Sequence, residues 1–299
     1  MIKSTVRKRN LIGYVYIFPW IIGFLIFQLY PLVASFVYSF TDFSVTSKPE
    51  FVGLANYIEM FTKDESFYES LTVTFKYVFL AVPMKIAFAL LIAVILSQKL
   101  RGINWYRTAY YIPSIFGGSV AVSILWRFLF MESGLINRML NSIGLASVPW
   151  LSSPKIALFT LILLSVWQFG SSMVLFLAAL KQVPLDMYEA ARIDGAGRVQ
   201  VFRSITLPMI SPVLFFNILM QMINGFQDFT GSFVITNGGP LRSTYMYAMK
   251  LYNDAFTHFN MGYASALSWV LFVIIFVITV LFFRFTNAAV YYEDGGDSK

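Results

Sequence analysis

The stretch EAARIDGAGRVQVFRSITLPMISP, residues 189–212, interrupts a chain that is 58% hydrophobic and only 12% charged. It lies between two long apolar runs and carries five charged side chains: Glu189, Arg192, Asp194, Arg198 and Arg203. Two glycines and a terminal proline, with helix-forming residues between them, indicate an ordered element rather than a loose loop. The role that this stretch can have depends on the side of a membrane on which it lies.

Six apolar windows surround this stretch, and each is long enough to cross hydrocarbon, which takes about 20 residues at about 1.5 Å rise each. They cover roughly residues 12–40, 71–97, 107–130, 156–180, 207–230 and 263–286. We therefore expect an all-α, polytopic membrane protein with six transmembrane helices, forming a single transmembrane domain over residues 1–299. The basic start of the chain resembles a signal peptide, but the first window is too long and no small-residue cleavage site follows it, so we expect a retained first span.

The distribution of lysine and arginine predicts the orientation, because cytoplasmic loops carry an excess of both. With the N-terminus inside, thirteen basic residues lie on the inner side: Lys3, Arg7, Lys8, Arg9, Lys99, Arg101, Arg107, Lys181, Arg192, Arg198, Arg203, Arg284 and Lys299. Six lie in the outer loops: Lys48, Lys63, Arg138, Lys155, Arg242 and Lys250. Both termini, and the stretch at residues 189–212, are therefore expected to be cytoplasmic. The formal charge of +7 mostly reflects this bias, and no basic cluster with stacking aromatics predicts a nucleic-acid partner.

The cytoplasmic stretch is predicted to form two helices joined by a turn, over about residues 184–206. Pro184 suits a first helical turn, and Asp186 and Glu189 favour the positive end of the helix dipole. The first helix should end at Gly195, and a second short helix should follow before Leu207-Pro208. From physics alone, an amphipathic loop lying at the membrane interface explains these residues equally well.

The order of residues in this stretch resembles the "EAA" signature of permease subunits of binding-protein-dependent ABC importers. The signature positions are Glu189, Ala190, Ala191, Asp194, Gly195, Ala196, Phe202, Ile205, Leu207 and Pro208. The segments FVGLANYIEMF (residues 51–61), TNGGPLRST (236–244), YNDAF (252–256) and MGYASALS (261–268) are similar to the carbohydrate-uptake branch of that family, the maltose, glycerol-phosphate and multiple-sugar type. The likeness covers nearly the whole chain.

This resemblance implies the type I ABC importer permease fold and a set of partners. The helices around Gly195 would be coupling helices seated in a cleft of a cytoplasmic ATPase, with Glu189 facing a basic residue of that ATPase. The partners would be a second, homologous permease subunit, two ATPase subunits and an extracytoplasmic solute-binding protein that delivers a sugar or oligosaccharide. The location would be the plasma or inner membrane of a prokaryotic cell. This chain has no G-x-x-x-x-G-K-[ST] loop and should not bind ATP by that route, so we expect ATP hydrolysis in the separate subunit.

Polar side chains inside the windows mark a candidate path for the solute, because polar groups at bilayer depth usually face an interior or a water-filled cavity. The fifth window carries a stripe at helical spacing, and windows three and four add aromatic and amide groups: Asn217, Gln221, Asn224, Asp228, Trp126, Trp167 and Gln168. Amides and aromatic faces suit a neutral polyhydroxylated solute. The same residues also join helices by hydrogen bonds, which is the alternative explanation.

Lys85 is unusual because it lies near the middle of the second window, where a cation is costly unless it is hydrated or paired. Pairing with Asp228, contact with the partner subunit, attraction of an acidic sugar and snorkelling to the interface all remain open.

Two other functional classes are considered. A membrane-embedded enzyme would need a nucleophile with a base, or metal ligands, but the chain has no Cys and a single His, His258, in an outer loop. We therefore expect no catalytic residue, metal or cofactor. An ion-gradient-driven secondary transporter of a polar solute is the serious alternative, but it predicts mid-depth carboxylates and internal repeats, and Asp228 is the only acidic residue within a window.

Overall fold

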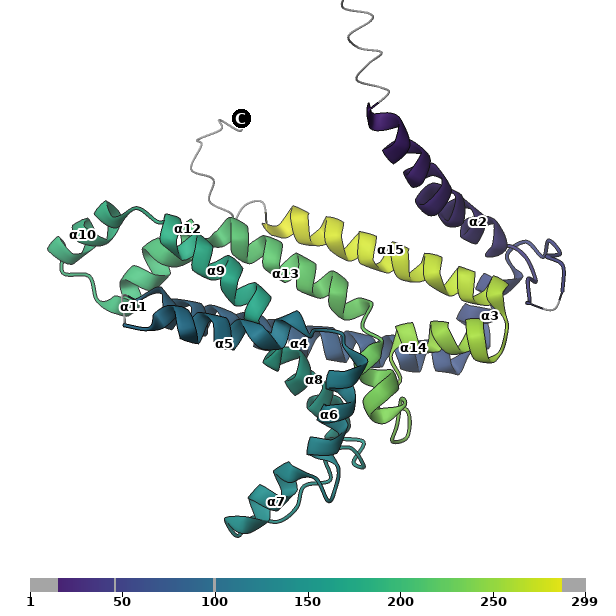
Figure 1. Ribbon diagram of the computed structural model, residues 1–299. Coiled ribbons are helices and arrows are strands. Elements are labelled where there is room, and N and C mark those ends of the chain that lie inside the picture. The colour runs from purple at the N-terminus through teal and green to yellow at the C-terminus, as the bar shows by residue number, and fades with distance from the viewer. Residues whose placement is uncertain (1–15, 46, 99–100, 287–299) are drawn as a thin grey trace, which may run out of the picture. The chain divides into compact units, whose positions relative to one another are not determined.

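The computed structural model describes residues 16–45, 47–98 and 101–286 (Figure 1). Within these residues helices dominate, and the only β-type pairing is an isolated bridge between Thr41 and Phe51. The all-α prediction is therefore confirmed for the described chain. Several sequence predictions fall outside it: those on residues 12–15 of the first window and on Lys3, Arg7, Lys8, Arg9, Lys99 and Lys299.

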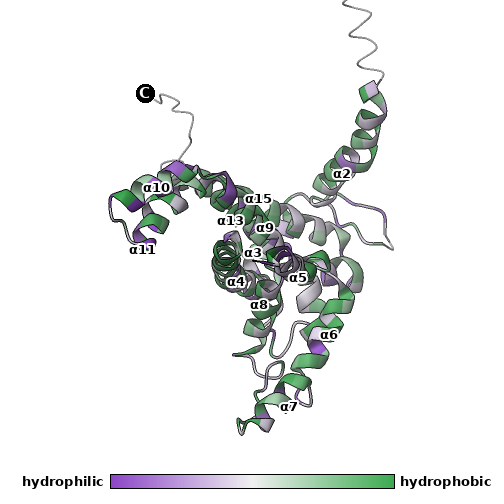
Figure 2. Ribbon diagram, turned by 60° about the vertical axis from the view of Figure 1, so that its left-hand side comes forward, coloured by the Kyte–Doolittle hydropathy of each residue, from purple (hydrophilic) through white to green (hydrophobic). Residues whose placement is uncertain are grey.

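Four helical stretches in the described ranges are long and apolar enough to cross a membrane: Tyr16–Tyr38, Glu65–Ser97, Met261–Phe285 and Val120–Ser142, the last of which comprises α6 (Val120–Phe130) and α7 (Leu135–Ser142). Two further candidates are bent pairs, Ala157–Trp167 with Gly170–Gln182 and Arg198–Met209 with Ser211–Phe226. If each pair is one span, the number rises to six, as the apolar windows predict. Figure 2 shows hydrophobic residues along most of these helices and hydrophilic residues gathered near α10 and α11.

The described chain divides into two compact units, and the first consists of residues 16–45, 47–64 and 251–273. It includes η1 (Leu25–Leu29) and α2 (Tyr30–Tyr38) of the first helix, α3 (Ala55–Thr62), η4 (Asn253–Thr257) and the beginning of α15 (Met261–Thr286). The buried Asn56 donates to the carbonyls of Ser39 and Thr41 at 2.9 and 3.0 Å. Trp269 Nε1 donates to Ser35 Oγ at 3.2 Å, which links α15 to α2.

The second unit, which comprises residues 65–98, 101–250 and 274–286 of the described chain, is organised around the long helix α4 (Glu65–Ser97). α4 packs against α8 (Ala157–Trp167), α9 (Gly170–Gln182) and α13 (Ser211–Phe226) (Figure 1). α4 buries small and medium side chains, among them Ala81, Ala89 and Ala93, which let its neighbours approach closely. Large apolar side chains such as Phe79 and Leu91 stay more than half exposed, at 57% and 56%. Such an apolar surface suits lipid or another subunit rather than water.

The third window differs from a simple span, because the structure divides it into α5 (Ile103–Ile115) and α6 (Val120–Phe130). The break contains Gly117 and Gly118, and Gly118 adopts a positive φ of 71°, which ends a right-handed helix. Pro113, within α5, weakens the last turn before the break. The hydropathy of the window does not reveal this interruption.

A short helix, α7 (Leu135–Ser142), follows α6. Leu135, Met139 and Ile143 are 53%, 59% and 71% exposed. The loop that follows is anchored by the buried Asn137, whose amide donates to the carbonyls of Glu132 and Val148 and accepts from Trp150 Nε1 at 3.0 Å.

The segment after α13 runs through η3 (Ser232–Thr236) to α14 (Tyr247–Tyr252). Ser232 donates its hydroxyl to the carbonyl of Thr244, which closes the loop between the two elements. The backbone N–H of Tyr247 donates to Thr74 Oγ1 at 2.8 Å, which ties α14 to α4.

Candidate functional site

A cavity of about 530 Å³ lies within the second unit, lined by residues of α4, α5, α6, α8, α9 and α13 and of the segment that follows α13. Apolar residues and glycines share its lining with ten residues that carry an amide or a hydroxyl: Gln168, Gln221, Asn224, Gln227, Ser114, Ser123, Ser165, Ser171, Thr230 and Tyr77. Two lining residues are charged, Lys85 and Asp228. A volume of this size accommodates a small polar molecule, and amides that both donate and accept can bind hydroxyl groups from several directions.

Two breaks in the helices expose backbone to this cavity. Gly117 and Gly118, between α5 and α6, line it, and so does Gln168, between α8 and α9. Ser114 joins the two breaks, because its hydroxyl donates to the carbonyl of Gln168 and accepts from the N–H of Ser171, both at 3.1 Å. Irregular backbone at membrane depth is tolerated where it is buried in protein or lines a water-filled cavity. The helix breaks therefore mark this cavity as a polar interior.

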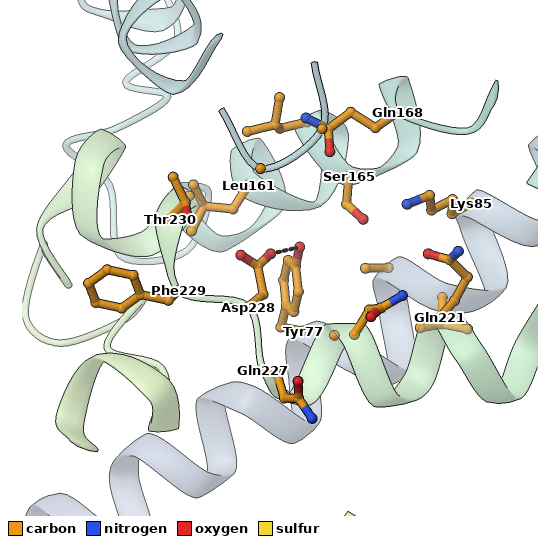
Figure 3. A pocket seen from close by; sticks show the side chains of 18 of the residues that line it. Tyr77, Lys85, Leu161, Ser165, Gln168, Gln221, Gln227, Asp228, Phe229 and Thr230 are labelled. Atoms are coloured by element: carbon orange, nitrogen blue, oxygen red, sulfur yellow. Dashed lines mark hydrogen bonds between the residues drawn. The ribbon is translucent and has the colours of Figure 1, made fainter. Parts of the chain in front are cut away.

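The two charged side chains of the cavity, Asp228 and Lys85, differ in their contacts (Figure 3). Asp228 Oδ2 accepts a hydrogen bond from the hydroxyl of Tyr77 at 2.5 Å, and Tyr77 itself is only 3% exposed. Lys85 extends its amino group into the cavity toward Ser165. No ion pair joins Lys85 to Asp228, and the amino group has no hydrogen bond to any residue that the structure describes.

The cavity gathers four of the seven residues predicted for a solute path: Gln168, Gln221, Asn224 and Asp228. The remaining three lie elsewhere. Asn217 is 1% exposed and donates to the carbonyl of Ser172 at 3.4 Å, which is a helix-packing contact. Trp126 donates to the carbonyl of Thr160 at 3.1 Å, and its ring lies 5.8 Å from that of Trp167. These three residues join helices rather than line the cavity.

The placement of Asp228 corrects the predicted stripe. The spacing puts Asn217, Gln221, Asn224 and Asp228 on one face of a continuous helix, but α13 ends at Phe226 with Gln227 as its C-cap. Asp228 therefore lies beyond the helix and reaches the cavity from the following segment. Tyr77 and Ser165 were not predicted, and both lie inside apolar windows where a single hydroxyl gives no distinctive signal.

The EAA stretch forms the two predicted helices, α10 (Leu185–Ile193) and α11 (Arg198–Val201), the second continuing through η2 (Phe202–Thr206) and α12 (Leu207–Met209). Pro184 is the N-cap of α10. At its end, the N–H of Gly195 bonds to the carbonyl of Arg192 at 3.1 Å, and the N–H of Ala196 to that of Ala191 at 2.9 Å. This pair of bonds is the Schellman motif, which needs a left-handed residue at Gly195, where φ is 74°.

The base of this element is firmly packed, whereas its tip is exposed. Tyr188 hydrogen-bonds Thr206 Oγ1 at 3.2 Å, which ties α10 to η2. Tyr188, Ile205 and Met209 also pack on a buried cluster of Ala179, Val183 and Ile210 from α9 and the start of α13. In contrast, Ile193 and Val199 are 87% and 67% exposed, and Glu189, Ala190 and Asp194 are exposed as well. The element is a rigid projection with a mixed apolar and charged surface.

A second hollow, of about 1290 Å³, lies between this element and the adjacent ends of α4, α5 and α9. Five basic side chains line it, Arg101, Arg107, Lys181, Arg192 and Arg198, against one acidic side chain, Glu189. No ion pair neutralises them among the described residues. A projection with this charge is suited to a partner surface of opposite sign.

Comparison with known proteins agrees with these features. Residues 63–290 match the family model described as the binding-protein-dependent transport system inner membrane component. The probable ABC transporter permease protein YesP of Bacillus subtilis is 50% identical over 294 residues, covering 97% of this chain and 95% of that protein. The arabinooligosaccharides transport system permease protein AraP of the same species is 32% identical, covering 96% and 92%.

The fold has a counterpart among solved structures. A chain in the crystal structure of a bacterial ABC transporter involved in the import of the acidic polysaccharide alginate aligns with a TM-score of 0.84. The alignment covers 96% of this chain and 99% of that chain at 22% identity, a likeness that concerns the fold. Together with the family match and the relatives above 30% identity, it confirms the type I ABC importer permease fold. The chain belongs to the binding-protein-dependent transport system inner membrane components, the multi-pass permease subunits of ABC transporters.

Proposed function

We propose that this chain is one transmembrane subunit of an ATP-driven importer of sugars or oligosaccharides. The observation that carries the proposal is the cavity between the helices, whose lining includes many amides and hydroxyls and which is connected through packed helices to the exposed EAA projection. The name of the AraP relative, an arabinooligosaccharides transport system permease, supports a saccharide as the solute. Amide and hydroxyl groups without a surplus of charge match the hydrogen-bonding capacity of such a solute.

In this proposal the four cavity residues Gln168, Gln221, Asn224 and Asp228 contact the solute during its passage. The chain pairs with a homologous permease subunit, and a solute-binding protein delivers the saccharide from outside. Both termini and the EAA projection lie in the cytoplasm of a prokaryotic cell, and the chain resides in its plasma or inner membrane. The excess of lysine and arginine on the corresponding side supports this orientation.

The EAA projection is one of two such coupling elements in the complex, and it transmits the motion of the ATPase subunits to the helices of this chain. Because its base is packed on α9 and α13, a displacement of the tip moves both helices together. Closure of the ATP-bound ATPases would then rotate these helices and open the cavity outward, and hydrolysis would reverse the movement. Such a transition is a switch between two packed arrangements rather than a continuous deformation.

Reconstitution tests the proposed function. The chain, its homologous permease, the ATPase and the binding protein are co-purified and placed in liposomes, and labelled oligosaccharides are offered on the binding-protein side. We expect accumulation that requires ATP and the binding protein. Accumulation by the permease subunits alone, driven by an ion gradient, would instead establish the secondary transporter.

Glu189→Ala should reduce ATP-dependent uptake strongly while leaving membrane insertion unchanged. Glu189 is exposed on α10 and has no ion pair among the described residues, so it contributes little to the stability of the chain. Loss of a charged contact with the ATPase costs about 1.5–3 kcal/mol, or roughly tenfold to hundredfold in affinity. Co-purification of the ATPase and uptake measure the effect. Asp186→Ala is the matched control, since it removes a carboxylate from the same helix outside the signature.

A further inference from the structure

The charged residues of the cavity indicate the class of saccharide that the cavity binds. This inference rests on the function proposed above. We propose that Lys85 is a specificity-determining residue that binds the carboxylate of an acidic saccharide, one that contains a uronic acid. Asp228 and the surrounding amides then bind the hydroxyl groups of the same molecule.

The first observation is the position of Lys85. It lies on α4, twenty residues after Glu65 and twelve before Ser97, within the longest apolar helix that the structure describes. Its amino group points into the cavity rather than along the helix toward an interface (Figure 3). Snorkelling, which carries a lysine head to the headgroup region, is therefore not its arrangement here.

The second observation is that Lys85 has no directly bonded counter-ion. Asp228 is the only carboxylate that lines the cavity within the described chain, and its Oδ2 is bound by the hydroxyl of Tyr77 at 2.5 Å. Asp228 attracts Lys85 electrostatically, but Lys85 makes no ion pair with it and no hydrogen bond to any described residue. A cation inside a membrane protein normally pairs or marks a substrate pathway, because an unpaired charge there is costly. An anionic group on the solute would supply the missing partner.

The third observation is the composition of the remaining lining. Gln168, Gln221 and Asn224 offer donors and acceptors but no charge, so they recognise hydroxyl groups without distinguishing acidic from neutral sugars. Asp228 can accept hydrogen bonds from sugar hydroxyls through its remaining lone pairs. Lys85 is thus the one cationic lining residue among those described, so it is the group that attracts a uronate, whereas the carboxylate of Asp228 repels it.

The test compares matched pairs of solutes in the reconstituted complex. Oligomannuronate, oligoguluronate, oligogalacturonate and oligoglucuronate of two to five residues are each offered beside the same oligosaccharide with its carboxyl groups reduced to alcohols. We expect wild-type complexes to import at least one acidic oligosaccharide in preference to its reduced form. Lys85→Met should lower uptake of the acidic form roughly tenfold to hundredfold and remove the preference, whereas Lys85→Arg should retain it.

Lys76→Met is the matched control. Lys76 lies on the same helix, is exposed and does not line the cavity, so its loss removes the same charge without touching the site. Co-purification of the subunits checks assembly for each variant. The wild-type preference itself requires no substitution, so the proposal stays testable even if Lys85→Met fails to assemble.

Two results would overturn the inference while leaving the proposed function intact. One is import restricted to neutral oligosaccharides by wild-type complexes. The other is an equal loss of acidic and neutral uptake in Lys85→Met, which would make Lys85 a structural residue. Absence of ATP-dependent uptake for every saccharide would instead overturn the proposed function, and this inference with it.

Discussion

Replacing Gly195 by proline is expected to abolish ATP-dependent uptake while leaving the chain inserted in the membrane. Gly195 has a φ of 74°, and its N–H bonds to the carbonyl of Arg192 at 3.1 Å. Proline has no N–H and holds φ near −65°, so the turn between α10 and α11 cannot form as it does here, at a cost of about 3 kcal/mol or more. Proline also disfavours the helical conformation of Asp194 before it.

The effect should be a loss of coupling rather than a loss of folding. The turn lies at the exposed tip, and the packed base around Val183 and Ile210 does not depend on it. The ATPase should therefore retain basal hydrolysis, while stimulation by solute and binding protein disappears. Gly197→Ala is the matched control, because Gly197 has an ordinary φ of −71° and a Cβ there would meet nothing within 4 Å. Normal uptake by Gly195→Pro, or equal damage from Gly197→Ala, would contradict the coupling role.

Replacing Gln221 and Asn224 together by leucine is expected to reduce uptake at least about thirtyfold without preventing assembly. Both amides line the cavity from α13, and leucine is similar in size but offers no hydrogen bond. A solute hydroxyl buried against leucine loses its partner, which costs about 1–3 kcal/mol for each group left unsatisfied. The two free-energy losses add, so their effects on affinity multiply, because every 1.4 kcal/mol changes affinity by a factor of ten.

Asn217→Leu separates this path role from helix packing. Asn217 lies on the same helix, but it is 1% exposed and bonds to the carbonyl of Ser172 instead of lining the cavity. Its replacement should lower the thermal stability of the purified complex, while the complexes that assemble remain able to transport. The reverse pattern, with transport lost only in Asn217→Leu, would place the path on the other face of α13.

The sequence alone predicts the helical content, the apolar windows and the end of α10, because those features are local. A glycine after a run of helix formers, with proline before it, predicts the left-handed turn at Gly195 without any tertiary information. The resemblance to the EAA signature then identifies the element. Hydropathy predicts candidate spans as well, since an apolar run of sufficient length needs no partner to be recognised.

The cavity depends on tertiary contacts that sequence spacing does not contain. The helical spacing groups Asn217 with Gln221 and Asn224, but only the position of α9 decides that Asn217 is packed while the other two face the cavity. Likewise, Tyr77 meets Asp228 across 151 positions of sequence. The break at Gly117 and Gly118 is locally visible as two glycines, but its role as part of the cavity wall follows from Ser114 bridging to Gln168.

The central claim is that a separate ATPase binds the EAA projection. The most direct test is site-specific cross-linking, because the chain contains no cysteine and one can be introduced at a chosen position. One variant, Ile193→Cys, carries its only cysteine at the tip of the projection, where Ile193 is 87% exposed, and it is cross-linked in the assembled complex. A separate variant, Leu145→Cys, is the control for the opposite side of the membrane, because Leu145 lies beyond α7 and is 54% exposed. The account predicts that Ile193→Cys cross-links to the ATPase with a yield that changes on ATP binding, and that an impermeant thiol reagent added outside intact cells labels only Leu145→Cys. Labelling of Ile193→Cys from outside, or cross-links to lipid alone during turnover, would contradict it.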